Sequence, residues 1–238
     1  MKPLNYHDLL DAFAETGCPV CRLLKADGDR FLDLLFHENI MDVGVQQSVR
    51  AARLLCSTHA WQMITFRGRA QDIAVLCEAV LDELIERVDT STQIMPGLRL
   101  PFAPARSNGA ADALEPTQPC MCCAHIDRME KNYIQTIATY FGEADMQEAY
   151  RVSEGLCLPH FRMLLRMLRD PALAKTAMEV QLHLWRLLKD ELTLFLHRTS
   201  TNNIDEPIGA EADSWRRAIM QLAGDDDVFG LRRGEDKS

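Results

Sequence analysis

The sequence lacks the signatures of the common enzyme and membrane-protein classes. Among its 238 residues, no apolar run reaches the length of a membrane span. No apolar stretch follows a basic start, so we expect no signal peptide and a cytoplasmic location. A Gly-rich phosphate loop, a Gly-x-Ser-x-Gly motif and paired carboxylates at a recognisable spacing are also missing. These absences favour a binding or structural protein over an enzyme, and one without a membrane partner.

Strand signals are scarce as well, and the 35 acidic residues outnumber the 26 lysines and arginines. No segment convincingly alternates apolar and polar residues, whereas Leu, Ala, Met, Glu and Arg are plentiful, so we predict an all-α fold with helices packed as a bundle. The formal net charge of −9 repels nucleic acid and anionic lipid. Arg162, Arg166 and Arg169 could form a local basic patch, but a solvated helix face is the simpler explanation. We therefore expect a protein partner rather than nucleic acid.

Proline is concentrated in one segment. Five of the ten prolines lie between Gln93 and Pro119, which we interpret as a linker between two folded halves. The predicted organisation is a first helical unit over residues 1–92, the linker over 93–119, a second helical unit over 120–223, and a flexible tail over 224–238.

The eight cysteines carry most of the information. Structural disulfides are not expected in the cytosol, so the cysteine spacing indicates metal or redox chemistry. Each half contains a Cys-x2-Cys pair followed by a Cys-x2-His pair, which we call clips, and the halves match at an offset of 102 and then 101 positions. The clips are Cys18 with Cys21 and Cys56 with His59 in the first half, and Cys120 with Cys123 and Cys157 with His160 in the second. This repeat predicts a tandem duplication of one helical unit.

The segments between the clips also match. Their apolar residues recur at three- and four-residue steps, as in an amphipathic helix. The matched pairs are Leu24 and Ile126, Phe31 and Tyr133, Leu32 and Ile134, and Leu35 and Ile137. A long helix is expected to open at each Cys-x2-His clip, and further helices are expected over about Tyr6 to Glu15 and Ala210 to Leu222.

The second half contains a tripeptide that suggests a longer final helix. Asp82-Glu83-Leu84 matches Asp190-Glu191-Leu192 at an offset of 108. This offset predicts seven extra residues just after the second Cys-x2-His clip, with a kink or break near Asp170-Pro171.

Four soft or borderline ligands from two clips are what a tetrahedral Zn²⁺ site requires. We therefore predict one Cys3His zinc site within each half. The first would use Cys18, Cys21, Cys56 and His59, and the second would use Cys120, Cys123, Cys157 and His160. Four protein ligands leave no open coordination position, so both Zn²⁺ ions would be structural. The alternatives are an iron–sulfur cluster on the same ligands, or cysteines that are simply small buried side chains.

Two cysteines stand outside the clips. Cys77 lies on an apolar helical stripe and aligns with Trp185 at the offset of 108, so we expect it in the core. Cys122 lies beside a candidate ligand, where the first half has Val20, and we interpret it as an extra thiol.

Three segments resemble an uncharacterised bacterial family, a domain of unknown function with repeated cysteine clips. They are Gly17-Cys-Pro-Val-Cys-Arg-Leu-Leu24, Gly155-Leu-Cys-Leu-Pro-His160, and Trp215-Arg-Arg-Ala218 with Leu222-Ala-Gly224. The resemblance covers most of the chain and implies a mostly helical bacterial protein with all eight candidate ligands. It implies no established activity. The chain departs from the family pattern at Cys122 and in its long central linker.

Three interpretations of function follow. The leading one is a metal-stabilised helical binding or scaffold protein, with a partner protein in the grooves between its long helices. The second is a thiol and zinc redox sensor, in which oxidation releases metal and Cys122 is the resolving thiol. The third is an iron–sulfur protein. A dithiol oxidoreductase fits least, because a catalytic Cys-x2-Cys usually lies in a βαβ fold.

Overall fold

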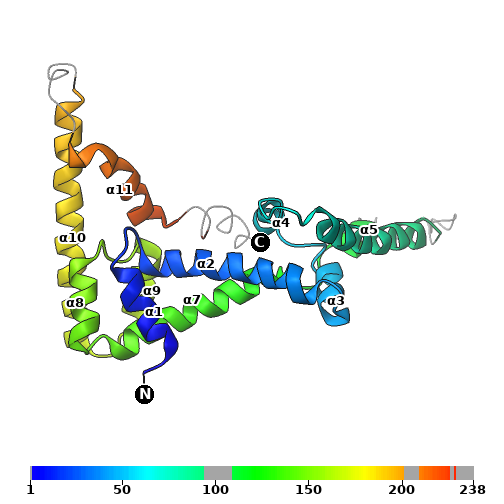
Figure 1. Cartoon of the computed structure of the whole chain (residues 1–238), viewed down its shortest axis with the longest axis horizontal. Coiled ribbons are helices and arrows are strands. Elements are labelled where there is room, and N and C mark those ends of the chain that lie inside the picture. The colour runs from blue at the N-terminus through cyan, green and yellow to red at the C-terminus, as the bar shows by residue number, and fades with distance from the viewer. Residues whose placement is uncertain (1, 94–108, 201–208, 226–227, 229–238) are drawn as a thin grey trace, which may run out of the picture. The chain divides into compact units, whose positions relative to one another are not determined.

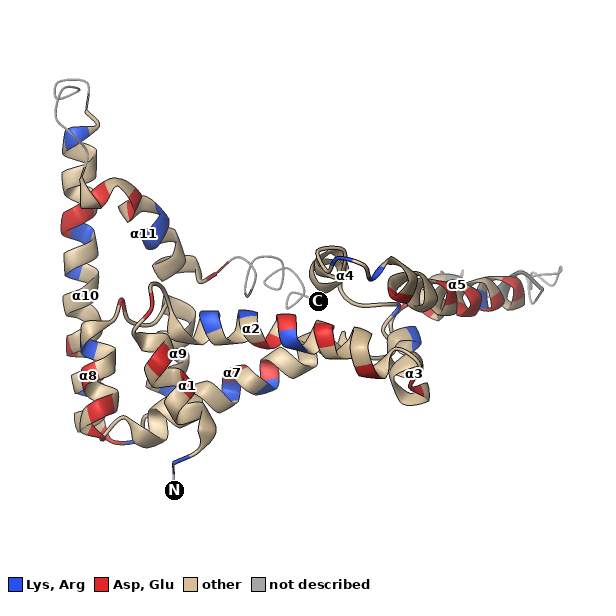
Figure 2. Cartoon of the chain, viewed as in Figure 1, with Lys and Arg blue, Asp and Glu red and all other residues tan. Residues whose placement is uncertain are grey.

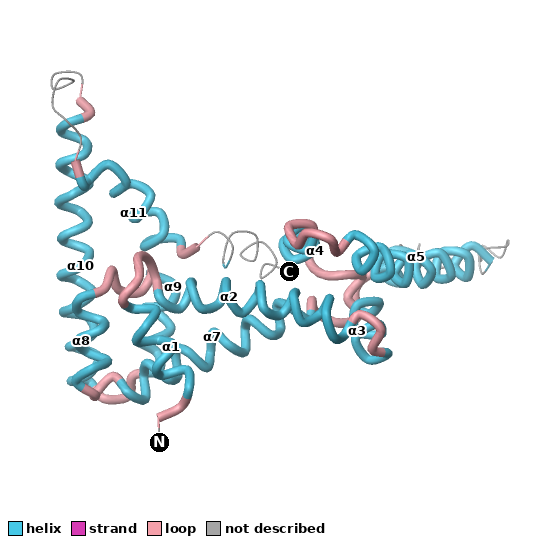
Figure 3. Tube along the Cα trace, in the orientation of Figure 1, coloured by secondary structure: helices cyan, strands magenta, loops and turns pink. Residues whose placement is uncertain are grey.

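The computed structural model describes residues 2–93, 109–200, 209–225 and 228. Within these ranges the chain forms helices and turns without any strand (Figure 3), which confirms the predicted all-α class. Most of the predicted linker and of the predicted tail lies outside the described residues. None of the described helices is long and apolar enough to cross a membrane.

The helices follow one another along the chain as Figure 1 shows. In order they are α1 (Leu4–Phe13), α2 (Pro19–Leu34), the π-helical turn η1 (Leu35–Asn39), α3 (Val43–Ala51), α4 (Ser57–Met63), α5 (Ala70–Gln93), α6 (Gly109–Leu114), α7 (Met121–Tyr140), α8 (Ala144–Val152), α9 (Leu158–Met167), α10 (Pro171–Arg198), the 3₁₀ turn η2 (Ala210–Asp213) and α11 (Ser214–Ala223). The expected first helix is α1, and the expected last helix is η2 followed by α11.

The described chain divides into two compact units. The central unit comprises Gly28–Asp127, and the terminal unit comprises Met1–Asp27 together with Arg128–Ser238. Both boundaries fall inside helices, one in α2 and the other in α7. The compact units therefore differ from the two sequence halves. The start of α2, which opens the first half, belongs to the terminal unit, and the start of α7, which opens the second half, belongs to the central unit.

Helix order repeats between the two halves. α2 and α7 begin 102 positions apart (19 and 121). The next three pairs each begin 101 positions apart: α3 and α8 (43 and 144), α4 and α9 (57 and 158), and α5 and α10 (70 and 171). The single-residue difference between the halves therefore lies before α3.

This constant offset corrects two expectations. The helix that opens at each Cys-x2-His clip is short, 7 residues in α4 and 10 in α9, and the long helix begins separately. The seven-residue insertion after the second clip is also wrong, because α5 and α10 keep the offset of 101. The tripeptide match at an offset of 108 is a coincidence, because the helices that contain it, α5 and α10, begin 101 positions apart. Cys77 consequently aligns with Met178 and not with Trp185.

The predicted break at Asp170-Pro171 is confirmed. The Asp170 side chain caps α10 by accepting a hydrogen bond from the Ala172 backbone N–H at 2.8 Å. Pro171 begins the helix, where its missing N–H costs no intrahelical bond. The local cap chemistry is therefore what separates α9 from α10.

The terminal unit packs around aromatic side chains. Tyr6, Leu9 and Phe13 of α1 are buried, and α1 packs on α8. The Tyr150 ring of α8 lies edge-on between two others, with centroids 5.6 Å from those of Phe13 and Phe141. Edge-on aromatic contacts of this kind add to the free energy gained from burial.

The loop before α9 is held by α10. Gln181 is fully buried, and its Oε1 accepts hydrogen bonds from the Tyr150 hydroxyl at 2.5 Å and the Leu156 N–H at 3.1 Å. Gly155 has a φ of +81°, and a Cβ there would lie 2.8 Å from a side chain of α10. Glycine is therefore needed both for the backbone conformation and for the close approach. This loop leads directly into Cys157.

The central unit is built around α5. Both α3 and α6 pack on this helix, and Leu76 and Val80 of α5 are buried. Arg53 joins α6 to α5, because its guanidinium donates to Glu83 Oε1 at 2.8 Å and to the carbonyl oxygens of Ala113 and Leu114 at 3.2 and 3.1 Å.

Candidate metal centres

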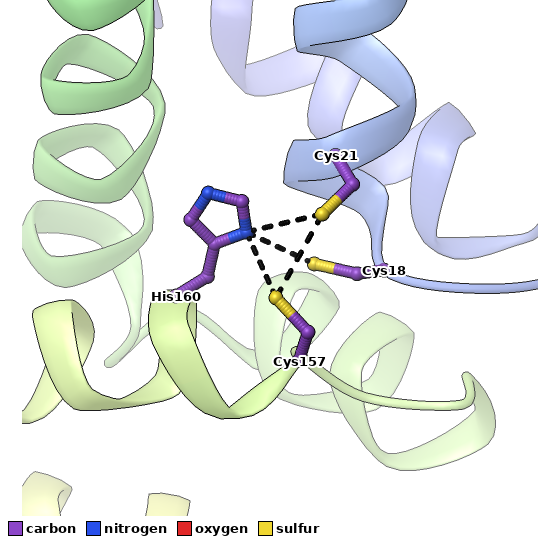
Figure 4. Close-up of side chains that lie close together, drawn as sticks. All are labelled: Cys18, Cys21, Cys157 and His160. Carbon is purple, nitrogen blue, oxygen red and sulfur yellow. Dashed lines mark hydrogen bonds between the residues drawn. The ribbon is translucent and has the colours of Figure 1, made fainter. Parts of the chain in front are cut away.

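The first group of candidate ligands lies in the terminal unit (Figure 4). This terminal site consists of Cys18, Cys21, Cys157 and His160, whose ligand atoms all lie within 4.8 Å of one another. His160 Nδ1 lies 3.4, 3.5 and 3.2 Å from the Sγ atoms of Cys18, Cys21 and Cys157. The Sγ atoms of Cys21 and Cys157 are 3.7 Å apart. All four residues are buried.

The second group lies in the central unit. This central site consists of Cys56, His59, Cys120 and Cys123, again with all ligand atoms within 4.8 Å of one another. His59 Nδ1 lies 3.2, 3.6 and 3.4 Å from the Sγ atoms of Cys56, Cys120 and Cys123. The Sγ atoms of Cys56 and Cys123 are 3.5 Å apart.

The structure brings together all eight predicted ligands, but not in the predicted sets. Each Cys-x2-Cys clip meets the Cys-x2-His clip of the other half, so the prediction of a complete site within each half is wrong. The cause is the helix between the clips. α2 has 16 residues and α7 has 20, about 24 and 30 Å, whereas α3 and α8 have only 9 residues each, about 14 Å. The shorter helix cannot bring the chain back to the clip where the half began.

Each clip lies at the start of a helix. Cys56 and Cys157 are the N-cap residues of α4 and α9, and Cys18 and Cys120 directly precede α2 and α7. The second ligand of each clip follows three residues later, in the first helical turn, where it faces the same side. Free backbone N–H groups and the helix dipole favour thiolate at these positions. Helix formation alone therefore preorganises two ligands.

The separations in both groups suit a tetrahedral ion. Bonds of about 2.3 Å to sulfur and about 2.1 Å to nitrogen put tetrahedral ligands about 3.8 Å apart for two sulfurs and about 3.6 Å apart for sulfur and nitrogen. The observed sulfur–sulfur distances are 3.5 and 3.7 Å. The sulfur–nitrogen distances range from 3.2 to 3.6 Å. Each group could therefore hold one metal ion.

The thiols of each group share their protons unequally. Burial raises the pKa of Cys18, but hydrogen bonds from Cys157 and Cys21 and the charge of His160 outweigh it, so the pKa lies well below its ordinary value. The interactions with the Cys157 and Cys18 sulfurs, together with burial, raise the pKa of Cys21 strongly. In the central site, hydrogen bonds from Cys123 and Cys56 lower the pKa of Cys120 to about 2. A bound cation would stabilise all three thiolates of a group together.

The two sites differ in what supports the histidine. His160 Nε2 lies 3.0 Å from Glu130 Oε1 on α7, a contact that fixes the ring and makes Nδ1 a stronger ligand. At the offset of 102, the position matching Glu130 is Gly28 on α2, which has no carboxylate. No described residue bonds to His59 Nε2. The terminal site is therefore the better supported of the two.

The two sites also differ in burial. Cys56 and Cys123 of the central site are half-buried, whereas every residue of the terminal site is buried. The central site is thus more open to chelators and oxidants. The two remaining cysteines lie outside both groups, with Cys122 fully buried and Cys77 half-buried.

Comparison with known proteins identifies the family of the chain. The model of a family of unknown function (DUF6062) matches residues 3–228, a range that includes all eight candidate ligands. The chain belongs to this family. The match confirms the resemblance to an uncharacterised family of unknown function. No curated protein and no solved structure matches the chain.

Two double substitutions test the crossed arrangement of this DUF6062 protein. Cys18→Ser with Cys157→Ser removes two ligands from the terminal site only, so one metal ion per chain should remain. Cys18→Ser with Cys56→Ser damages both sites, so the metal content should fall toward zero. Native mass spectrometry counts the ions directly. The opposite pattern would show that each half holds its own ion.

A second prediction concerns Glu130. Glu130→Ala should weaken metal binding at the terminal site by about 10- to 100-fold, because His160 loses the carboxylate that orients it. When metal is transferred from the protein to a chromogenic chelator, the central site should release it in a fast phase and the terminal site in a slow phase. Glu130→Ala should accelerate the slow phase. Glu148→Ala is the control, since it removes an exposed carboxylate that pairs with Arg151 and lies outside both ligand groups. A slow phase that is unchanged by Glu130→Ala would contradict the role of this contact.

Proposed function

We propose that this protein is a helical binding or scaffold protein whose fold is stabilised by two Zn²⁺ ions. The observation that carries the proposal is the convergence of three cysteines and one histidine in each unit, at separations that suit one tetrahedral ion. Both groups supply four protein ligands, so neither leaves an open position for a substrate. That is the coordination of structural rather than catalytic zinc.

Ligand chemistry and geometry both support zinc. Thiolate and imidazole together suit a borderline ion such as Zn²⁺, and three thiolates with one neutral histidine give a site of net charge −1. An iron–sulfur cluster binds its ligands through several iron atoms, which spreads them around the cluster. Ligand atoms that all lie within 4.8 Å of one another favour a single ion.

The partner that we propose is another protein. The chain carries a net charge of −9, which disfavours nucleic acid and anionic membranes. Two adjoining grooves beside α5 offer a surface of the size that a peptide segment needs. Eight cysteines without a disulfide fit a reducing compartment such as the cytoplasm.

The partial exposure of the central site favours a second candidate, a thiol redox sensor. Two thiolates of the central site could give two electrons to peroxide and form a disulfide, while the peroxide takes up protons and is reduced to water. The metal would then leave the site. Cys122 is fully buried and lies outside the central ligand group, so we place the sensor thiols among the ligands themselves and not at Cys122. The candidate sensor thiols are therefore Cys56, Cys120 and Cys123.

The zinc assignment predicts the metal content of the purified protein. Protein isolated without oxygen should be colourless and contain two zinc ions per chain by elemental analysis. Cys56→Ala should lower the melting temperature far more than Cys77→Ser, because only Cys56 belongs to a ligand group. A brown solution containing iron and labile sulfide would refute the zinc assignment, and equal melting losses would show that Cys56 has only a packing role.

A peroxide titration separates the scaffold from the sensor. If the protein is a scaffold, mild peroxide should leave both zinc ions bound, because zinc-bound thiolates are shielded from oxidant. Cys122→Ser should then leave zinc release unchanged. Released zinc is followed with a chromogenic chelator, and disulfides are mapped by mass spectrometry. Release from the central site alone, together with a disulfide between its cysteines, would overturn the scaffold in favour of the sensor.

A further inference from the structure

The two long helices of the repeat are covered differently. In the terminal unit, α11 packs on α10. Its Arg217 bonds to Glu191 of α10, and also to Asp213 Oδ1 at 3.0 Å. The α10 residues that line the space beside α11 include Leu184, Leu187, Leu188 and Glu191. A short helix with two adjacent arginines, Arg216 and Arg217, thus covers this face of α10.

The matching face of α5 has a groove in that place. At the offset of 101, the four α10 residues correspond to Glu83, Glu86, Arg87 and Thr90. These four line a groove of about 760 Å³, together with Ala79 and Asp82 of α5, Arg50 of α3 and Ala113 of α6. Among the described residues, α6 borders the groove with 6 residues, whereas α11 has 10.

A second cavity extends the groove toward the start of α3. It has a volume of about 390 Å³, is lined by some of the same residues, and adds Met41, Val43 and Val75. Met41 is 75% exposed and Val43 is 69% exposed, so apolar surface is available at this end. From Val75 to Thr90 the groove follows α5 for about 22 Å, the length of a helix of about four turns.

The groove has unneutralised negative charge. Glu83 is paired with Arg87 and Arg53, at 2.7 and 2.8 Å, and the hydrogen bonds from these two arginines lower the pKa of its carboxyl. Glu78, Asp82 and Glu86 are exposed and make no ion pair with any described residue, although Arg50 lines the opposite wall. We call these three carboxylates the acidic row. Figure 2 shows how acidic residues gather along α5.

The acidic row is unfavourable for the chain by itself. Its members are four residues apart, so each repels the next along one face of α5. On α10 the corresponding residues are Glu179, His183 and Leu187, so the repeat does not require the row. A basic partner would relieve the repulsion.

We propose that the groove on α5 binds a short basic amphipathic helix of a partner protein, much as α11 lies on α10. This inference rests on the proposed binding function and names its surface and partner class. Lysine or arginine side chains of the partner neutralise the acidic row, and its apolar side chains cover Met41, Val43 and Val75. A second copy of the chain fits less well, because two acidic rows would face each other.

A peptide with the sequence of α11 provides a defined probe. The segment Ser214–Ala223 is made as a stapled, fluorescein-labelled helix, and its binding to the full chain is measured by fluorescence anisotropy. Charge reversal by Asp82→Lys with Glu86→Lys should weaken binding about fivefold or more, and added salt should weaken binding to the wild type. A peptide with glutamate in place of both arginines should show the same loss. The charge-matched control on α10, Glu179→Lys with Asp190→Lys, should bind like the wild type.

Several results would overturn the groove proposal. One is binding that is lost in Glu191→Gln but kept after reversal of the acidic row, since the peptide would then be replacing α11. Another is a dimer in sedimentation that the reversal dissociates, since a second copy would then occupy the groove. Zinc is counted in every sample. If the chain contains two zinc ions but does not bind the peptide, the groove proposal alone is refuted. If the purified chain contains no zinc, the proposed zinc-stabilised function is refuted.

Discussion

The structure depends on the crossed pairing of the clips. Cys21 and Cys157 are 136 positions apart, and Cys56 and Cys123 are 67 apart, yet each pair belongs to one ligand group. Closing chain segments of this length costs conformational entropy that a metal bond can offset. Neither half contains a complete group. Each compact unit therefore needs residues from both halves, which is why the unit boundaries cut through α2 and α7.

Local sequence was enough to predict the parts of the structure that local forces determine. The helical class follows from composition and apolar spacing, and the break at Asp170-Pro171 follows from a capping side chain and a proline. The eight ligands follow from their spacing, because two residues on the first turn of a helix can reach the same ion. Most of the apolar residues matched between the halves, such as Leu32 and Ile134, are buried as an amphipathic pattern predicts, and Phe31 is half-buried.

The pairing of the clips could not be predicted in this way. Either Cys-x2-His clip offers the same atoms to Cys18 and Cys21, so spacing does not distinguish the crossed arrangement from one site per half. The choice depends on the lengths of α2 and α3, and the sequence pattern left those helix ends uncertain. The prediction from the offset of 108 was wrong for a related reason, since a match of only three residues does not fix the alignment of two long helices. The groove on α5 depends on how α3 and α6 pack, which periodicity alone does not show.

The crossed arrangement also explains how the two halves could diverge. Two separate copies of one half could form the same pair of sites only by exchanging clips, as in a domain-swapped dimer with two equivalent sites. In a single chain the two sites no longer have to be equivalent. Glu130 supports one histidine, and Gly28 occupies the matching position for the other. One long helix carries α11, whereas the matching face of the other holds a groove. A single chain thus lets one unit keep a buried ligand group that a carboxylate supports, while the other unit has a partly exposed ligand group and an acidic surface.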